Sequence, residues 1–388
     1  MGDAMMADTV LVGTRKGLIV FSRQATGWRR ESEHFVGVQA TYVGVDRRHN
    51  TVWACLNHGH WGVKLHRSAD LGTTWDECDV PTFGWGTEIT PGKAASVSYL
   101  WTLQPGGADQ PQRLYLGTIP GGLFVSDDGG SSWALNEPLW HHPSRKLWFG
   151  GGMDDAGIHS VIVDPQDSRH VWVGVSAAGI FETVDDGAKW TSRNQGLRAD
   201  FLPDPYAEIG HDPHFVVGCP GEPHVLWQQN HCGIFSSQDG GGQWQNVSQL
   251  EGPAKFGFAV AVDPHDAQTA WVVPAISDEH RVAVDRALCV CRTTDGGASW
   301  TRFHEGLPQQ DCYDFAFRHA LDVSGDRLAF GTAGGSCYVS DDRGENWTCL
   351  GSHLPPVYSV LYSNRSCPCR HWYTQAALPY ALARPTLR

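Results

Sequence analysis

The stretch that decides the fold is Gly122-Leu-Phe-Val-Ser126-Asp-Asp128-Gly-Gly130-Ser-Ser-Trp133. It contains the pattern Ser/Thr-x-Asp-x-Gly-x-x-Trp, which occurs six times at intervals of roughly 50 residues. The other five copies begin at Ser68, Thr183, Ser237, Thr293 and Ser340, and a seventh, degenerate copy from Ser22 to Trp28 lacks the Asp. Such a period is typical of a fold built from repeated structural units.

The residue types in the pattern predict a turn between two strands. An apolar run before the motif reads as a strand, and the Asp carboxylate can accept hydrogen bonds from backbone N–H groups of its own turn. Gly permits a positive φ, and Trp begins the next strand and packs between neighbouring sheets. The six repeated carboxylates are therefore interpreted as structural, and not as catalytic pairs.

One complete repeat contains four predicted strands, at residues 159–165, 170–175, 179–183 and 189–193. Inner strands are expected near 41–45, 97–103, 159–165, 214–219, 258–262 and 314–318. The first unit lacks one, and residues 357–363 would supply it. The sequence thus predicts an all-β, seven-bladed β-propeller over residues 1–364, closed by pairing of the N- and C-terminal strands, followed by a tail, 365–388.

Charge and composition exclude several classes of function. The 42 acidic residues outnumber the 29 basic ones, for a net charge of −13, which disfavours nucleic acid and acidic membrane surfaces as partners. No run of about 18 apolar residues and no signal-like start is found. The eleven cysteines, including the Cys289/Cys291 and Cys367/Cys369 pairs, read as reduced thiols of a cytoplasmic protein, with zinc only weakly indicated.

The repeats resemble those of the Asp-box, or bacterial neuraminidase repeat, propellers over about residues 9–364. That group includes sialidases, sortilin ectodomains, xyloglucanases and a photosystem assembly factor. The resemblance implies the propeller fold. A sialidase would also have an early Arg-Ile-Pro segment, which this chain lacks.

The inner-strand alignment places His159 and His214 at the same position of adjacent blades, at the mouth of the central channel. Tyr99, Tyr358 and Asp314 take the equivalent position in three other blades. Loops expected on the same face carry most of the remaining histidines. Because imidazole is the commonest metal ligand, we expect a divalent transition metal, with Zn, Fe, Cu and Mn not distinguished. The expected ligands are His60, His159, His214 and His231.

Other residues of this face are assigned supporting roles. Asp155 and Glu279 are candidate general bases, and Arg15 is a further catalytic candidate. Expected substrate-binding residues are His58, Trp61, Tyr99, Trp148, His211, His280 and Tyr358.

These residues favour a metal-dependent enzyme of hydrolase, lyase or oxygenase type that acts on a small molecule. The alternative is a non-catalytic module that recognises a protein, peptide or glycan. A third possibility, a glycosidase of sialidase type, requires two suitably spaced carboxylates on this face, for which Asp155 and Glu279 are the available pair. The oligomeric state is not indicated.

Overall fold

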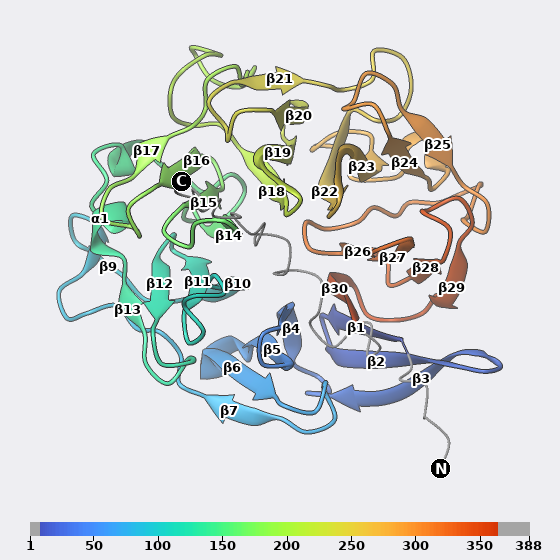
Figure 1. The fold of residues 1–388 in the computed structure, drawn as a ribbon, viewed down its shortest axis with the longest axis horizontal. Helices are drawn as coiled ribbons and strands as arrows, with labels where there is room; N and C mark the ends of the chain where they lie inside the picture. The colour runs from blue at the N-terminus through green and yellow to red at the C-terminus, as the bar shows by residue number, and fades with distance from the viewer. Residues whose placement is uncertain (1–7, 364–388) are drawn as a thin grey trace, which may run out of the picture.

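The computed structural model describes residues 8–363. They form a ring of seven four-stranded antiparallel sheets, the blades, around a central axis (Figure 1). The predicted all-β, seven-bladed propeller is therefore confirmed. The predicted tail, 365–388, lies outside the described residues, as do residues 1–7 and 364.

The blades follow one another along the chain, and each consists of four strands that run in order from the centre of the ring outward. The first contains β30 (Val357–Ser363), β1 (Thr9–Thr14), β2 (Gly17–Gln24) and β3 (Gly27–His34). The second contains β4 (Gln39–Asp46), β5 (Thr51–Asn57), β6 (Val63–Ser68) and β7 (Asp76–Cys78). The third contains β10 (Tyr99–Pro105), β11 (Leu114–Ile119), β12 (Leu123–Ser126) and β13 (Ala134–Leu135), and the fourth contains β14 (Ile158–Val163), β15 (Val171–Val175), β16 (Gly179–Thr183) and β17 (Thr191–Ser192).

The remaining three blades have the same antiparallel order. The fifth contains β18 (Pro213–Cys219), β19 (Glu222–Asn230), β20 (Gly233–Ser237) and β21 (Trp244–Asn246). The sixth contains β22 (Phe256–Asp263), β23 (Asp266–Ala275), β24 (Val290–Thr293) and β25 (Thr301–Phe303), and the seventh β26 (Leu321–Ser324), β27 (Arg327–Gly331), β28 (Cys337–Ser340) and β29 (Thr348–Gly351). Loops carry the hairpin β8 (Glu88–Thr90) and β9 (Lys93–Ala94), the helix α1 (Glu137–Trp140), and the 3-10 turns η1 (Gly59–Trp61), η2 (Arg145–Leu147) and η3 (Val284–Arg286).

The ring is closed as the sequence predicted. β30, the last described strand, pairs with β1 in antiparallel register, with Thr9 opposite Ser363 and Val12 opposite Val360. Figure 1 shows these two strands side by side at the inner end of the first blade. The pairing satisfies the edge of β1, and β30 becomes the inner edge strand of the sheet.

Each repeated turn is held by the same short-range hydrogen bonds. In the third blade, Ser126 Oγ donates to Asp128 Oδ1 at 2.8 Å and accepts from the Gly130 N–H at 2.8 Å. The Ser132 N–H and hydroxyl both donate to the Asp128 carboxylate. These bonds, the Ser132 hydroxyl foremost, lower the pKa of Asp128 to about 2. The carboxylates of the repeated motif thus accept hydrogen bonds within their own turns.

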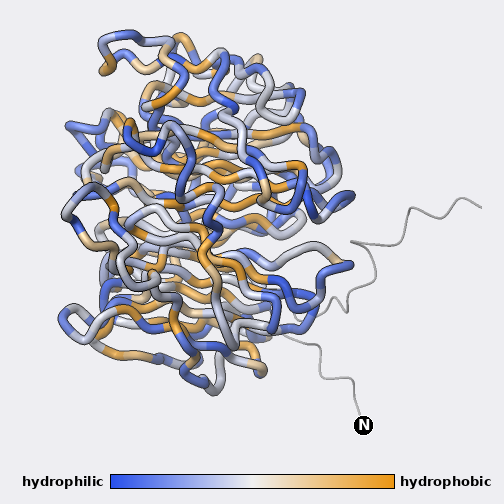
Figure 2. Tube along the Cα trace, turned by 90° about the vertical axis from the view of Figure 1, so that its left-hand side faces the viewer, coloured by the Kyte–Doolittle hydropathy of each residue, from blue (hydrophilic) through white to orange (hydrophobic). Residues whose placement is uncertain are grey.

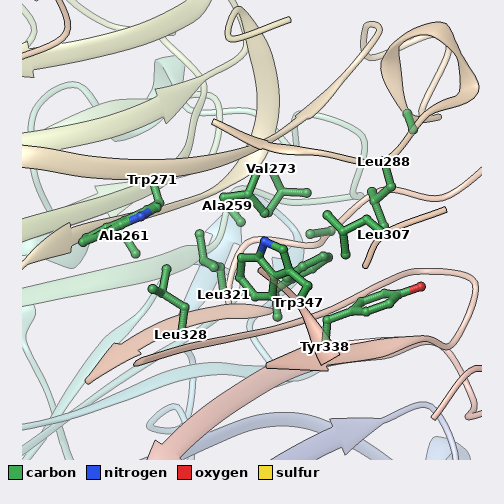
Figure 3. Close-up of a cluster of buried hydrophobic side chains, with 14 of the residues drawn as sticks. Ala259, Ala261, Trp271, Val273, Leu288, Leu307, Leu321, Leu328, Tyr338 and Trp347 are labelled. Carbon is green, nitrogen blue, oxygen red and sulfur yellow. The ribbon is translucent and has the colours of Figure 1, made fainter. Parts of the chain in front are cut away.

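The core lies between the blades. Figure 2 shows apolar segments concentrated in the strands and hydrophilic segments in the loops at the periphery. Figure 3 shows Trp347, from the last repeat, beside Val273 and Leu328, in a buried cluster shared by the sixth and seventh blades. Indole N–H groups add bonds between blades: Trp244 donates to the Arg193 carbonyl, and Trp300 to the Val247 carbonyl, both at 2.8 Å.

One inner strand differs from the prediction. In the seventh blade the inner strand is β26, Leu321–Ser324, and residues 314–318 form the loop that leads to it. The turn from β26 pairs Ser324 with Arg327, as Asp263 pairs with Asp266 in the sixth blade. Counting back five residues from these turns shows that His319, and not Asp314, is the residue equivalent to His159, His214 and Phe258 in the other blades. The alignment failed because this blade lacks the proline that follows the inner strands of the fourth, fifth and sixth blades.

Two further properties of the described part bear on function. No helix within residues 8–363 is long and apolar enough to cross a membrane. All nine cysteines in the same range are free thiols, and Cys289 and Cys291 lie side by side with their sulfurs hydrogen-bonded. The pair Cys367/Cys369 lies outside the described residues.

Candidate functional site

Three side chains, those of Asp212, His214 and His231, converge where the fifth blade meets the channel. The two histidines were predicted as ligands. Asp212 immediately precedes β18, His214 is its second residue, and His231 follows β19. Because β18 and β19 are antiparallel, with Pro213 opposite Asn230, the residues flanking that pair are brought together. The His231 N–H donates to the Asp212 carbonyl at 3.0 Å and fixes this junction. We call this end of the channel, lined by Asp212, His214 and His231, the channel mouth.

The geometry of these side chains suits a shared cation. Their ligand atoms all lie within 4.8 Å of one another. Asp212 Oδ2 is 3.7 Å from His214 Nε2 and 3.7 Å from His231 Nδ1, beyond hydrogen-bonding distance. His214 Nδ1 is 2.6 Å from the Gly257 carbonyl, which can only accept, so this nitrogen carries the proton and Nε2 has the free lone pair. A histidine oriented by a backbone carbonyl in this way is typical of metal ligands.

Burial controls the charges at the channel mouth. It is the main cause that lowers the pKa of His214 well below its usual value, with the charge of Arg318 as a second cause. His214 is therefore neutral at pH 7, the form that binds a metal. Burial also raises the pKa of Asp212, while Arg318 and the Ala177 N–H work in the opposite direction. The Ala177 N–H donates to Asp212 Oδ1 at 3.0 Å.

Aromatic rings form a wall around the two imidazoles. His214 stacks on Phe258 with ring centroids 4.4 Å apart, and Phe256 makes edge contacts with both His214 and His231. Phe201 packs against His231 from a loop of the fifth blade. The wall lowers the local dielectric and would strengthen any charge interaction made there.

His159 occupies the neighbouring blade but is not one of the converging ligands. It is fully buried, contacts Trp101 edge-on at 5.4 Å, and its Nδ1 is 2.9 Å from Ser160 Oγ. Its Nε2 has no hydrogen-bond partner in the described structure, and its pKa is affected by the charge of His214. The two imidazoles are thus electrostatic neighbours, and the role of His159 as a ligand stays a prediction.

His319 is a third histidine close to the inner strands, two residues before β26, and it was not among the residues expected at the site. Its Nε2 is 2.8 Å from the His159 carbonyl on the opposite side of the ring, and its ring contacts Tyr42 and Phe215. It lines a cavity of about 530 Å³ at the opposite end of the channel, near Asp322. His319 therefore lies between the two ends of the channel, and it does not belong to the group formed by Asp212, His214 and His231.

The second-blade residues lie apart from the converging group. His60 and Trp61 are exposed in η1, and their rings contact each other at 4.8 Å. The charge of His58 acts on His66 and Glu77 of the same blade. Of the four histidines expected as ligands, the group that could hold a metal contains two, His214 and His231, together with the carboxylate of Asp212.

Of the expected catalytic residues, Asp155 has a different local partner, and Glu279 and Arg15 are exposed. Lys93 Nζ is 2.6 Å from Asp155 Oδ1, so this carboxylate is held in an ion pair. Glu279 and His280 are exposed in the loop after β23, and Arg15 is exposed in the turn between β1 and β2. Within residues 8–363, none of these four belongs to the group that could hold a metal.

The other expected substrate-binding residues divide into two sets. Trp148 packs on Phe181 at 4.9 Å, and His211 Nε2 is 2.7 Å from the Ala207 carbonyl, so both have local structural contacts. Tyr99 interacts electrostatically with Tyr358 and with Arg318. Tyr99, Tyr358 and Arg318 come from three different blades, in or next to their inner strands, and lie around the channel.

Sequence reasoning missed Asp212 and Arg318. Asp212 stood in the sequence two residues before His214, and a carboxylate at that spacing from an inner-strand histidine was a usable signal. Arg318 was hidden by the misplaced inner strand of the seventh blade. Its guanidinium lies over Trp101 at 4.9 Å and over Phe258 at 5.7 Å.

The known proteins that resemble this chain in sequence include enzymes much longer than it. No family model matches the chain. A xyloglucanase from Paenibacillus sp is 26% identical over 305 residues, which is 72% of this chain and 27% of that protein. The xyloglucanase Xgh74A of Acetivibrio thermocellus is 26% identical over 62% of this chain and 28% of its own length. The chain spans about a quarter of the length of these curated relatives.

Solved structures show the same architecture. An ancestral GH74 enzyme superposes with a TM-score of 0.52 and 14% identity, covering 93% of this chain and 40% of that one. A candidate 6-phosphogluconolactonase from Bacteroides fragilis superposes with a TM-score of 0.55 and 12% identity, covering 94% and 99%. The chain is thus a single seven-bladed propeller, and at these identities the likeness is one of fold.

Proposed function

We propose that this protein is a metal-dependent enzyme that acts on a small molecule at the channel mouth, with Asp212, His214 and His231 as the ligands. One observation carries the proposal: three donor atoms from separate positions lie within 4.8 Å of one another, and one imidazole is already oriented by a backbone carbonyl. Zn, Fe, Cu and Mn all accept this mixed nitrogen and oxygen set.

Three protein ligands leave coordination positions open, as in catalytic rather than structural metal sites. The ion would lower the pKa of a bound water or polarise a substrate carbonyl. Two histidines and one carboxylate serve hydrolytic zinc and non-haem iron(II) oxygenases alike. The metal found in the protein will therefore distinguish a hydrolase from an oxygenase.

Metal analysis of protein purified without a histidine tag tests the proposal. We expect close to one equivalent of a transition metal, measured by inductively coupled plasma mass spectrometry, and a loss of about tenfold or more in metal content for Asp212→Asn or His214→Ala. The exposed His224→Ala is the matched control. Less than about a tenth of an equivalent after reconstitution with Zn, Fe, Cu and Mn would contradict the metal site.

A glycosidase is the second candidate, and two observations favour it. The curated relatives are named xyloglucanases, and burial raises the pKa of Asp212, with the charge of Asp278 as a smaller cause in the same direction, so the two carboxylates are electrostatic neighbours. A protonated carboxyl beside an ionised one is the acid and base pair of glycoside hydrolysis. This pair replaces Asp155 and Glu279 as the one to test.

One assay distinguishes the metal-dependent enzyme from the glycosidase. Release of reducing ends from xyloglucan oligosaccharides by chelator-treated protein, abolished by Asp278→Asn as well as by Asp212→Asn, would support the glycosidase. Loss of all activity on chelation, restored by one metal, would support the metal-dependent enzyme.

We also infer that the chain belongs among the Asp-box propellers. Support comes from six turns with the same Ser/Thr–Asp–Gly hydrogen bonds, each with its Gly at a φ between 83° and 89°. Such membership describes the scaffold, and the chemistry still depends on the channel mouth.

A further inference from the structure

Arg318 is a half-buried cation without a hydrogen-bond acceptor in the described structure. Its guanidinium carbon lies 4.9 Å from the centre of the Trp101 ring and 5.7 Å from the centre of the Phe258 ring, and its Nε atom is buried with no partner. Within residues 8–363, no side-chain hydrogen bond and no ion pair is made by Arg318, although the charge of Asp212 attracts it. The side chain is only partly exposed.

An arginine in this state is costly unless something else satisfies it. The guanidinium has five N–H donors in one plane and cannot lose its charge at physiological pH. Leaving a buried donor such as the Nε N–H unpaired destabilises a protein, so natural structures supply an acceptor. Because the N–H bonds of a guanidinium lie in its plane, a partner of Arg318 would bind at the edge of that plane.

The surroundings of Arg318 select the partner. Arg281 lies over Phe258 at 5.1 Å and adds positive charge to the same place, while its own ion pair is with Asp278. The Tyr99 phenol is also an electrostatic neighbour of Arg318. An incoming anion would therefore meet two guanidinium groups and a phenol beside the metal ligands.

We propose that Arg318 is the substrate-recognition residue of the channel mouth and that it binds a carboxylate of the substrate through the edge of its guanidinium. The site would thus take small carboxylic acids. A carboxylate matches the planar fork with two parallel hydrogen bonds. A phosphate dianion would hold two negative charges on one group close to Asp212, whereas each carboxylate of a dicarboxylic acid carries only one, so a carboxylate is favoured. The inference rests on the proposed function in placing a substrate here, but it does not require the metal.

Binding of succinate, its uncharged analogue succinamide and inorganic phosphate to the full chain tests this inference. In NMR titrations at constant ionic strength, we expect succinate to bind the wild-type protein at least about tenfold more tightly than succinamide or phosphate. Arg318→Gln should weaken succinate binding by about tenfold or more, and Arg318→Lys by less. The exposed Arg29→Gln is the control and should bind as the wild type does.

Three results would overturn the inference: succinate that binds no better than succinamide, phosphate that binds better than succinate, or a folded Arg318→Gln variant with unchanged affinity. The first two results are obtained with the wild-type protein alone, so the inference can be tested even if the Arg318→Gln variant fails to fold. Metal without succinate binding defeats only this inference. Arg318-dependent succinate binding by protein that takes up no metal on reconstitution defeats only the metal proposal.

Discussion

His170 illustrates how single residues of this propeller are charged for structural reasons. Its ring nitrogens lie 3.1 Å from Asp164 Oδ2 and 2.9 Å from Glu182 Oε1, and it stacks on Trp172. Burial acts to lower its pKa, but the hydrogen bonds and charges of the two carboxylates outweigh it and raise the pKa to about 9. The same contacts lower the pKa of both carboxyls.

This pair of contacts gives a pH-dependent contribution to stability. The folded pKa of His170 lies above the value of 6.5 expected for the unfolded chain, so the contribution is full below about pH 6.5 and is lost as the pH rises through about 9. We expect His170→Gln to lower the free energy of unfolding by about 2 kcal/mol more at about pH 6 than at about pH 9.5.

Urea unfolding at the two pH values measures the difference, with the exposed His224→Gln as control. An equal loss of stability at both values would show that the charge of His170 contributes nothing. The same residue-scale reasoning separates His170, whose two ring nitrogens both contact carboxylates, from His214, which burial keeps neutral.

At the scale of the element, the repeated turn is tied to the preceding blade. In the fifth copy, Gly297 has a φ of +89°, and a Cβ at this position would lie 2.5 Å from Val247 Cβ. The indole of Trp300 in the same copy donates to the Val247 carbonyl. Two constraints, a left-handed backbone and a close approach, therefore meet at one glycine.

A pair of glycine substitutions separates these constraints. Gly297→Ala should reduce the free energy of unfolding by about 3 kcal/mol, since it combines backbone strain with a clash. Gly325→Ala, with a φ of +64° and nothing within 4 Å of the added carbon, should cost only about 1 kcal/mol.

Thermal and denaturant unfolding of both variants provide the comparison. Equal losses would mean that the blades move apart to admit the methyl group. In that case, the contact with Val247 would not constrain the turn.

At the scale of the whole molecule, closure depends on a non-covalent pairing of the two chain ends. β30 carries Val357, Val360 and Tyr362, all buried against the first and seventh blades. The Val360 N–H also donates to the His319 carbonyl at 2.8 Å, so β30 links both blades.

A chain that ends at Pro356 lacks this strand and should lose its cooperative unfolding transition. Each of the buried side chains contributes about 1.5–3 kcal/mol, and their sum is comparable with the whole stability of a typical domain. A chain that ends at Ser363 keeps all of β30 and is the control. Calorimetric transitions of similar sharpness and midpoint for the two chains would show that the ring holds without its closing pair.

The sequence by itself determined the scaffold. The repeated turn uses bonds between residues at most a few positions apart, such as Ser126 to Asp128, so its residue types report directly on local structure. Counting those turns predicted seven blades and the closing strand at 357–363. The shared position of His159 and His214 on adjacent inner strands was also correct, because equivalent strands obey one register.

Only the tertiary structure decided which side chains share a site. Asp212 and His231 meet through the register of one hairpin, and Arg318 reaches the channel mouth because β26 begins later than the repeat predicted. His60 and Asp155 share the expected face but point to local partners. Distances between blades depend on packing over the whole ring, and sequence spacing does not encode them.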